Sequence, residues 1–470
     1  LANLIQNAIE HGGAGGEIQL CVLPPGTIAV NDAGPGIPAH ERERVVQPFH
    51  RIQPRGRQDQ RQAAARPQRC CQECGPIFQV RAGLMRGVAP RHHRRSAAAG
   101  PEGRVGEGMV AGGQPAGQRQ VPHIGAEHLK GYRALPDRFA VRAICDLDLE
   151  RARAVAGDDS SIRVTTDLDE VLADESIQLI DVCLPPHLHF PVTLKAHAAG
   201  KDVVCEKPLV RSLEEANALI DSVKKTGRGV FPVFQYRFGQ AMRQLRALID
   251  AGLAGKAFVA SSEVHWNRGA SYYDIPWRGT WKGECGGAIL GHAIHAHDLL
   301  CYVLGPVEEV FAMADTRVNP IETEDSAALS FRMKNGALAT SSVTLGAAND
   351  TSRLRFCFEG FTAESGTLPY RPAEDTWRFI ARAPTAQDQI DAVLATVADG
   401  QNGFAGFVEA IADAMEGRGG KEVTVNDGLQ SIELVTAIYR SVREGKPVRL
   451  SDAAEGEWIK GWAPSASAKA

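Results

Sequence analysis

The chain has 470 residues, enough for roughly two to four domains, and its 44% hydrophobic and 23% charged residues are typical of a soluble globular protein. The net charge of −4 argues against a general nucleic-acid-binding protein, and no apolar run reaches the length of a membrane span. The N-terminus lacks the basic start of a signal peptide, so we expect a cytoplasmic protein with reduced cysteines.

Residues 1–50 combine an amphipathic helix pattern over residues 2–10 with a strand end and glycine-rich turn, VNDAGPGIP, over residues 30–38. This stretch resembles the ATP-binding domain of sensor histidine kinases. The residues that carry the resemblance are Asn3, Asn7, Asp32, Gly34, Gly36 and Phe49. The second glycine box of that family, which closes over the phosphates, is absent. We therefore interpret residues 1–50 as a truncated ATPase fragment without kinase activity.

Residues 51–118 are rich in Arg, Gln, Ala, Gly and Pro and show no lasting period of 2 or 3.6. Two interpretations remain open, a basic disordered linker that binds nucleic acid and a segment translated out of frame. We favour the second because motifs break off on both sides. The RCCQEC run at residues 69–74 has no second Cys/His pair at a suitable spacing, so we predict no metal site there.

Strands alternate with helices from residue 119 to residue 237, which predicts a Rossmann-type, doubly wound parallel α/β sheet. The expected strands cover residues 140–148, 177–186, 201–209 and 229–237, and the expected helices cover residues 123–135, 149–156, 167–173, 191–200 and 212–227. We expect the first strand and the glycine turn of this domain to be incomplete. No strand precedes the candidate pair Gly106 and Gly108, and Gly125 stands alone.

The stretch KDVVCEKPL, residues 201–209, is a short apolar strand that ends in Glu206, Lys207 and Pro208. Pro208 stops the strand and fixes the next φ, so Lys207 is held where open α/β sheets place their ligands. A surface Glu-Lys pair is the alternative. Asp146 ends another strand and suits a carboxylate that binds the ribose of NAD in preference to NADP. Its alternative role is that of a helix N-cap.

The sequence pattern changes at residue 238. Residues 238–450 contain strands with alternating or continuous apolar residues, a Lys-Asn-Gly hairpin turn at residues 334–336 and helices over residues 406–415 and 428–443. The densest polar cluster covers residues 265–268, 272–281 and 285–300. Within it, Gly286 and Gly287 precede a helix that places His292, His295 and Asp298 on one face. We expect this face to point into a cleft, the alternative being a solvated face. Residues 451–470 form a tail.

These motifs resemble the glucose–fructose oxidoreductase / inositol dehydrogenase / MocA family over residues 124–450. The most specific are AICDLD, CLPPHLH, CEKPL and GGAILGHAIHAHDLL. The resemblance implies a Rossmann NAD(P)-binding domain followed by an α/β domain with a large, mostly antiparallel sheet. It also implies an NAD(P)-dependent oxidoreductase acting on a secondary alcohol or ketone of a sugar, inositol or polyol. We expect a homo-oligomer formed through the C-terminal sheet.

Site residues follow from the same resemblance. It identifies Lys207 and His295 as catalytic. Its cofactor-binding residues are Asp146, Pro185, His189, Glu206 and Lys207. We predict that the substrate contacts are Arg237, Arg278, His292 and Asp298. Inositol dehydrogenase-like members carry Asp four residues before the catalytic histidine, where this chain has Gly291.

The chemistry agrees with the residue types, because a neutral histidine can take a proton from a hydroxyl while a lysine ammonium stabilises alkoxide charge. Three rivals remain: a non-catalytic nucleotide- or sugar-binding relative, an inactive chimeric product, and a zinc enzyme using His292, His295 and His297. The zinc hypothesis is disfavoured because no metallohydrolase motif supplies a glutamate base.

Overall fold

In the computed structural model, residues 19–23, 27–31, 105–111 and 124–464 are described. The chain divides into two units, Leu1–Ser96 and Ala97–Ala470. In the first unit, β1 (Gln19–Leu23) and β2 (Thr27–Asn31) form an antiparallel hairpin. The end of β2 agrees with the strand end expected before Asp32. The helix expected over residues 2–10 and the residues of the kinase resemblance lie outside the described residues.

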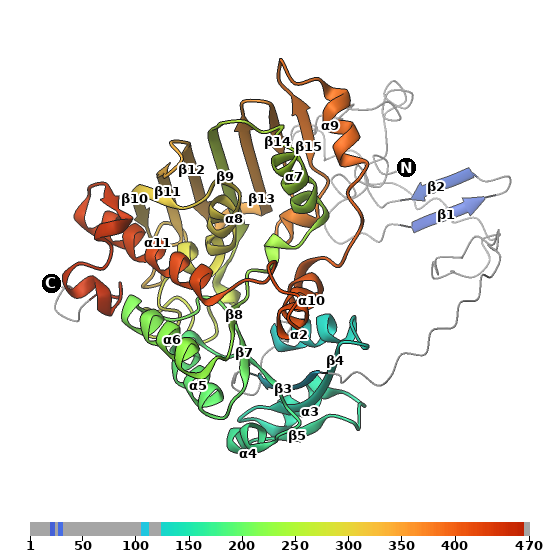
Figure 1. Cartoon of the computed structure of the whole chain (residues 1–470), viewed down its shortest axis with the longest axis vertical. Helices are drawn as coiled ribbons and strands as arrows, with labels where there is room; N and C mark the ends of the chain where they lie inside the picture. The colour runs from blue at the N-terminus through green and yellow to red at the C-terminus, as the bar shows by residue number, and fades with distance from the viewer. Residues whose placement is uncertain (1–18, 24–26, 32–104, 112–123, 465–470) are drawn as a thin grey trace, which may run out of the picture. The chain divides into compact units, whose positions relative to one another are not determined.

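The second unit begins with a six-stranded, entirely parallel sheet (Figure 1). Its order is β5-β4-β3-β6-β7-β8, which is the strand order of dinucleotide-binding folds. The order reverses between β3 and β6, and in such sheets ligands bind at that point, beyond the carboxyl ends of the strands. The strands are β3 (Val105–Ala111), β4 (Phe139–Cys145), β5 (Arg163–Thr165), β6 (Leu179–Cys183), β7 (Asp202–Cys205) and β8 (Val230–Pro232).

The expectation that the first strand of this sheet is missing is wrong. Strand β3 occupies its centre and pairs with β4 on one side and β6 on the other. Gly106 and Gly108 lie inside β3, not in a turn. Glycine is rare in strands. A buried strand is predicted from a continuous apolar run, and Gly106, Glu107 and Gly108 interrupt that run here. The segment in which the glycine turn is expected, residues 112–123, lies outside the described residues.

Helices cover the sheet between its strands: α2 (Ile124–Arg133), α3 (Leu149–Ala156), α4 (Leu168–Ala173), α5 (Pro186–Ala198) and α6 (Leu213–Thr226). Ser212 caps the start of α6, since its side chain accepts from Glu215 N. The Glu215 carboxylate in turn accepts from Arg211 N. The last predicted strand is shorter than expected: it ends at Pro232, and Gln235–Arg237 form a 3₁₀ turn, η3.

The second sheet has eight strands in the order β15-β14-β13-β9-β12-β11-β10-β16. Every neighbouring pair is antiparallel except β9 with β12, which confirms the predicted large, mostly antiparallel sheet. The predicted hairpin turn links β11 to β12, and Gly336 supplies its φ of +89°. The strands are β9 (Ala257–Asn267), β10 (Val307–Asp315), β11 (Ser326–Met333), β12 (Leu338–Thr344), β13 (Gly346–Phe358), β14 (Phe361–Glu364), β15 (Arg378–Ala381) and β16 (Val448–Arg449).

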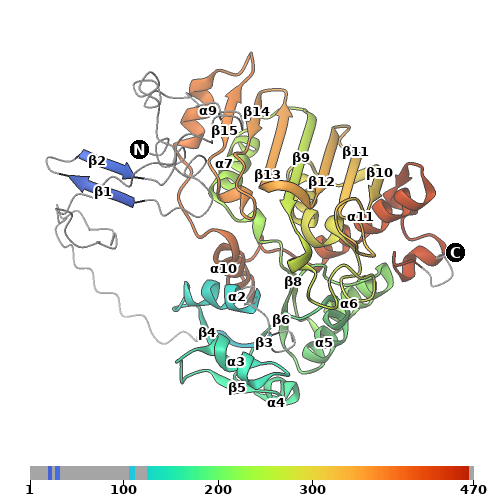
Figure 2. The same cartoon turned by 180° about the vertical axis from the view of Figure 1, so that it is seen from behind.

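One face of the large sheet is covered by α8 (Ile294–Leu304) and α11 (Val425–Glu444), and α11 also packs on α6 and β8 of the first sheet. Figure 2 looks onto the opposite face of the large sheet. The remaining helices of this part are α7 (Gln240–Asp250), α9 (Gln387–Leu394) and α10 (Gly403–Met415). Within the described residues, no helix is long and apolar enough to span a bilayer.

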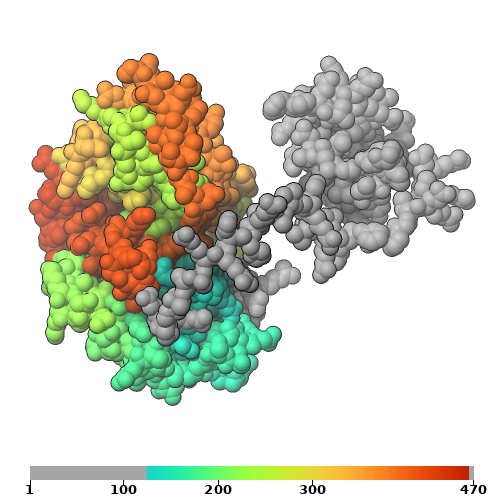
Figure 3. Space-filling view, turned by 45° about the vertical axis from the view of Figure 1, so that its right-hand side comes forward, coloured from blue at the N-terminus to red at the C-terminus, as the bar shows by residue number. Residues whose placement is uncertain are grey.

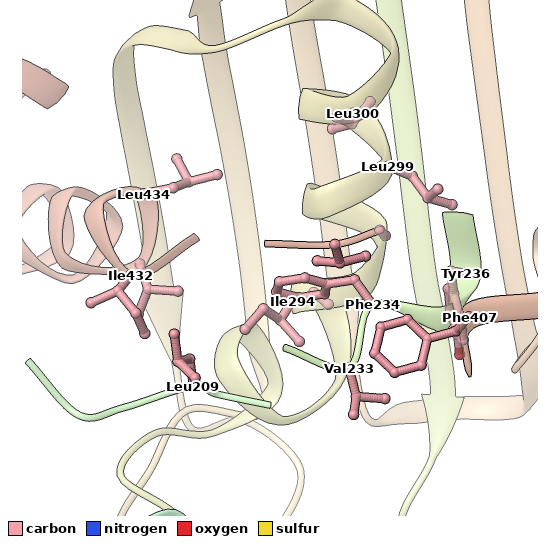
Figure 4. Close-up of a cluster of buried hydrophobic side chains, with 14 of the residues drawn as sticks. Leu209, Val233, Phe234, Tyr236, Ile294, Leu299, Leu300, Phe407, Ile432 and Leu434 are labelled. Carbon is pink, nitrogen blue, oxygen red and sulfur yellow. The ribbon is translucent and has the colours of Figure 1, made fainter. Parts of the chain in front are cut away.

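A continuous hydrophobic core joins the two sheets. Figure 4 shows Leu209 and Val233, from segments that follow strands of the first sheet, close to Ile294 of α8 and Ile432 of α11. In the space-filling view the segments of both sheets pack into one body (Figure 3). The core therefore fixes the end of β7 against the start of α8, the two elements on which the candidate site is built.

Candidate active site

Lys207 is held between the two sheets. Strand β7 ends at Cys205, and Lys207 reaches from there to the other domain, where its Nζ donates a hydrogen bond to the Gly291 carbonyl at 2.7 Å. Burial lowers the pKa of Lys207, and the neighbouring Glu206 carboxylate only partly opposes this effect. The prediction that a strand end positions this lysine agrees with the structure.

A π-helical turn, η5 (Ile289–Ala293), leads directly into α8 and presents the Gly291 carbonyl to Lys207. Such widened turns are rare and are often found at functional sites. The buried Glu324 carboxylate fixes the start of this turn by accepting from Gly287 N at 3.1 Å and Ile289 N at 3.0 Å. A Cβ at Gly287 would lie 1.8 Å from the Glu324 carbonyl oxygen, so only glycine fits there.

His292 and His295 project from this segment and are both buried. The His295 ring stacks on Tyr236 with a centroid distance of 4.5 Å, and its Nδ1 has no hydrogen-bond partner among the described residues. Burial, and then the Lys207 charge, lower the pKa of His295 to about 3. Burial and the same lysine also hold the pKa of His292 well below its usual value. Both imidazoles are therefore neutral at pH 7, and each offers a nitrogen to a ligand.

Arginine and aromatic side chains enclose His292. Its Nε2 lies 3.4 Å from the hydroxyl of Tyr272, which also accepts a hydrogen bond from Arg278. The Arg278 guanidinium lies over the Tyr272 ring, 4.0 Å from its centroid, and 3.5 Å from Glu284. The Arg268 guanidinium lies 5.4 Å from the centroid of the same ring. The structure thus brings Arg278 to the site as predicted.

Sequence reasoning missed Tyr272, Arg268 and Glu284 as individual site residues. They lie within or next to the polar runs at residues 265–268 and 272–281, so the density of aromatic and basic residues was the available signal. The sequence did not indicate that Tyr272 contacts both Arg278 and His292, the histidine of the π-helical turn η5.

The other two predicted substrate contacts, Arg237 and Asp298, bind each other. Arg237 Nε and Nη2 donate to the two Asp298 oxygens at 2.8 and 2.6 Å, and Nη1 donates to Asp427 at 2.8 Å. A bidentate pair of this kind occupies the donors that a substrate would need. The pair ties η3 to α8 and α11, so we leave Arg237 and Asp298 out of the proposed substrate contacts.

His189 also has a structural role, because both of its ring nitrogens face backbone carbonyl groups. Its ring is fully buried, with Nδ1 2.8 Å from the Pro208 carbonyl oxygen and Nε2 2.7 Å from that of Leu184. It joins the end of β6 to the loop after Lys207, so any effect of His189 on a cofactor acts through that loop. Pro185, at the N-cap of α5, is half-buried beside it.

Asp146 directly follows β4, at the strand end that the sequence predicts, and is buried. The alternative of an N-cap is wrong, because the N-cap of α3 is Asp148, whose side chain accepts from Glu150 N and Arg151 N. Asp146 instead accepts from Asp148 N at 2.9 Å and from the Arg151 guanidinium at 2.6 and 2.9 Å.

The three histidines of the zinc hypothesis do not converge. His297 points to the large sheet, where its Nε2 lies 3.0 Å from Ser341 Oγ. Among the residues that the structure describes, the group of three close enough to hold a metal is instead His128, Asp181 and Cys183.

Comparison with known proteins identifies the family. Residues 121–234 match the model of the oxidoreductase family with an NAD-binding Rossmann fold, and residues 242–363 match the GFO/IDH/MocA C-terminal domain. An uncharacterized oxidoreductase of Schizosaccharomyces pombe, C115.03, is 30% identical over 262 residues, which are 53% of this chain and 68% of that protein. The chain belongs to the GFO/IDH/MocA oxidoreductase family. Residues 1–65 match the histidine kinase-, DNA gyrase B- and HSP90-like ATPase family, as the N-terminal motifs predicted.

Relatives of known activity belong to the same family. Levoglucosan dehydrogenase of Pseudarthrobacter phenanthrenivorans is 26% identical over 290 residues, 54% of this chain and 70% of that protein. The crystal structure of the WlbA dehydrogenase from Bordetella pertussis, in complex with NADH and UDP-GlcNAcA, superposes with a TM-score of 0.62 at 26% identity. It covers 74% of this chain and 98% of that one.

The described residues fit a nicotinamide cofactor. The parallel sheet has the required strand order, Asp146 ends β4, and unpartnered nitrogens of His292 and His295 lie near Lys207 beyond the end of β7. Asp146 and Glu206 would hold the cofactor, and its chemistry would be to accept or donate a hydride.

His297 allows a test of how burial acts on these histidines. Burial lowers its pKa to about 4, so it resists protonation in the folded protein but not in the unfolded chain. The stability that this neutral form provides is present above pH 6.5 and is lost as pH falls towards 4. Between pH 7 and pH 5 we expect a loss of about 2 kcal/mol from this residue. Thermal melting of His297→Gln should show a correspondingly weaker pH dependence than the unmodified chain, and an unchanged slope would contradict this assignment.

Proposed function

We propose that this chain is an NAD-dependent dehydrogenase that interconverts a secondary alcohol and a ketone of a sugar, inositol or related polyol. Lys207 and His295 are the working pair, and Arg278 and His292 contact the substrate. The observation that carries this proposal is the hydrogen bond from Lys207 to Gly291, which anchors the lysine one turn before His295. One relative is named levoglucosan dehydrogenase and the WlbA dehydrogenase structure is a complex with UDP-GlcNAcA, and both support the sugar-like substrate class.

Each of these residues has a separate role in the proposed reaction. Neutral His295 takes the hydroxyl proton at its nitrogen when the alcohol is oxidised, and returns it when the ketone is reduced. The Lys207 ammonium stabilises the negative charge that develops on the same oxygen. Arg278 and Tyr272 supply hydrogen-bond partners for further hydroxyls, and burial of the site excludes water. A bound nicotinamide supplies the hydride acceptor.

Turnover with NAD⁺ tests the proposal directly. The full chain is incubated with NAD⁺ and a panel of hexoses, anhydrosugars, uronic acids and inositols, and NADH is followed by its absorbance. At least one member should give saturable NADH formation. NADH binding without turnover on the whole panel, in either reaction direction, would favour the non-catalytic alternative, and no NADH binding would favour the inactive chimeric product.

We infer NAD rather than NADP from Asp146. Its buried carboxylate would repel a 2′-phosphate, and its ion pair already occupies Arg151, the nearby cation that a phosphate would need. In Asp146→Asn we expect the ratio of kcat/KM for NAD to that for NADP to fall by roughly tenfold or more, because the repulsion is removed and Arg151 is released. Asp148→Asn is the control, since Asp148 caps α3. Equal ratios in the two variants would contradict the role of Asp146.

We also propose that the chain forms a homo-oligomer through the large sheet. Burial alternates along β9, β10, β12 and β15, so one face of each strand is exposed. Large apolar side chains at these exposed positions include Val259, Met313, Leu338 and Ile380, and Val259 pairs directly with Leu338 on the neighbouring strand. Exposed apolar side chains that lie together are typical of an interaction site. A second copy of the same sheet would cover it.

A further inference from the structure

His128 of α2 is buried between two carboxylates that belong to different strands of the first sheet. Its Nδ1 lies 2.9 Å from Asp181 Oδ2 on β6, and its Nε2 lies 3.1 Å from Glu206 Oε1 after β7. The histidine is only 2% exposed. A carboxylate can only accept, and a neutral imidazole can donate from only one nitrogen. Both hydrogen bonds form together only if the ring is an imidazolium.

The remaining neighbours of His128 favour this charged form. Tyr132 donates from its hydroxyl to Asp181 at 2.9 Å, and Cys183 Sγ lies 3.2 Å from His128 Nδ1. Phe404 of α10 stacks on the imidazole with a centroid distance of 3.8 Å and an angle of 16° between the rings, so its π face meets the cation. Burial is the largest single effect and lowers the pKa of His128, but the Asp181 charge, the smaller effect of Cys183 and the hydrogen bonds to both residues together raise it well above its usual value.

A metal ion is the competing explanation for His128, Asp181 and Cys183, whose ligand atoms lie close together. Metal binding needs a thiolate, whereas burial and the Asp181 charge raise the pKa of the Cys183 thiol to about 12. The Nδ1–Oδ2 separation of 2.9 Å is also that of a hydrogen bond. We therefore interpret the cluster as a proton-containing network.

Glu206 transmits the position of His128 to Lys207. Its Oε1 faces His128, and its Oε2 accepts from the backbone N–H of Lys207 at 2.9 Å. Burial opposes ionisation of Glu206, but the hydrogen bond and charge of His128, followed by the charge of Lys207, hold its pKa at about 2. Both carboxylate oxygens are thus fixed, one by α2 and one by the residue that we propose to be catalytic.

We propose that His128 is a positioning residue of the dehydrogenase reaction, a permanently charged imidazolium that keeps the Glu206 carboxylate ionised and fixed beside Lys207. The role rests on the proposed function, but the charge state of His128 does not. Without His128, the buried Glu206 carboxyl group loses a hydrogen bond and the charge that lowers its pKa most, and it keeps the backbone N–H and the ammonium of Lys207. It then takes up a proton near neutral pH, and the Lys207 ammonium loses its neighbouring anion.

The charge state can be measured without activity. The full chain is labelled with ¹⁵N-histidine, and the ring nitrogens are observed by NMR between pH 6 and pH 9. The signals that disappear in His128→Gln identify His128. Both of its nitrogens should have imidazolium shifts that persist to pH 9, whereas in Asp181→Asn they should titrate within this range. A neutral tautomer at pH 7 in the unmodified chain would overturn the proposal.

The positioning role is tested by the pH profile of kcat. In His128→Gln we expect a new acidic limb, because the ionised form of Glu206 is required and is lost as pH falls through its raised pKa. The activity ratio between pH 8.5 and pH 6 should rise by about tenfold over that of the unmodified chain. His197→Gln is the matched control, a buried histidine of the same sheet layer that pairs with Ser222.

A merely structural role for His128 predicts a pH-independent loss of activity in His128→Gln, and that result would refute positioning. If His128→Gln does not fold, Asp181→Asn carries the same test, since it removes the charge that stabilises the imidazolium and keeps the side-chain shape. If the unmodified chain turns over no substrate, the proposed function fails, and the NMR result still decides whether His128 is charged.

Discussion

Replacing Lys207 with methionine is expected to reduce kcat by roughly 10²-fold or more while leaving the fold intact. The ammonium is the positive charge that reaches the Gly291 turn from the end of β7, and methionine keeps most of its apolar length but cannot stabilise an alkoxide. The same charge also lowers the pKa values of His292 and His295 and helps to keep Glu206 ionised. Its removal also removes the cost of burying a cation, the effect that lowers the pKa of Lys207, so we expect the melting temperature to change little.

Lys201→Met is the matched control for this experiment. Lys201 is also a buried lysine next to β7, and its Nζ also donates to a backbone carbonyl, that of Asp174, at 2.7 Å. It lies before the strand instead of after it, so its loss should affect stability but not kcat. Near-normal kcat in Lys207→Met, or equal losses in the two variants, would exclude Lys207 as the electrostatic stabiliser.

Replacing His295 with glutamine is expected to lower kcat/KM by roughly 10²- to 10⁴-fold, the second large effect. The reason is the loss of the neutral, unpartnered nitrogen that accepts the substrate proton. Because burial and Lys207 lower the pKa of His295 to about 3, the free protein keeps this base neutral above that pH. The acidic limb of the kcat/KM profile should therefore lie below pH 5 and not near 6.5.

His297→Gln provides the comparison on the same helix. His297 is equally buried, but it faces Ser341 of β12 and not Lys207, so its replacement should leave kcat/KM within a few-fold of normal. Full activity in His295→Gln, or an acidic limb near pH 6.5 that is unaffected by the substitution, would show that another group takes the proton.

Much of the fold follows from patterns that are local in sequence. Alternation of buried strands with capped helices predicts the parallel sheet between residues 139 and 232, and helical spacing correctly places His292 and His295 together. Strand β3 was missed because Gly106 and Gly108 lack the side chains that mark a buried strand, while its stability comes from pairing with β4 and β6 on both sides.

Contacts between residues that are distant in sequence account for the errors in the predicted site residues. Asp298 shares a helix face with His295, yet Arg237 of η3 takes both of its oxygens, which no spacing could indicate. His128 and Glu206 are separated by 78 positions, and only the packing of α2 on the sheet brings them to 3.1 Å. Sequence patterns thus identify residue types and faces, while partners are decided by tertiary packing.

Transfer of deuterium from substrate to cofactor tests the central claim most directly. A polyol that gives turnover is prepared with deuterium on its carbinol carbon and mixed in a single turnover with the full chain and NAD⁺, and the mass of the reduced cofactor is measured. The account predicts deuterium in the NADH formed by the unmodified chain, and almost none with Lys207→Met, which should still bind NADH, within the time in which the unmodified chain completes its turnover. Unlabelled NADH from the unmodified chain, or equal label with Lys207→Met, would contradict hydride transfer at this site.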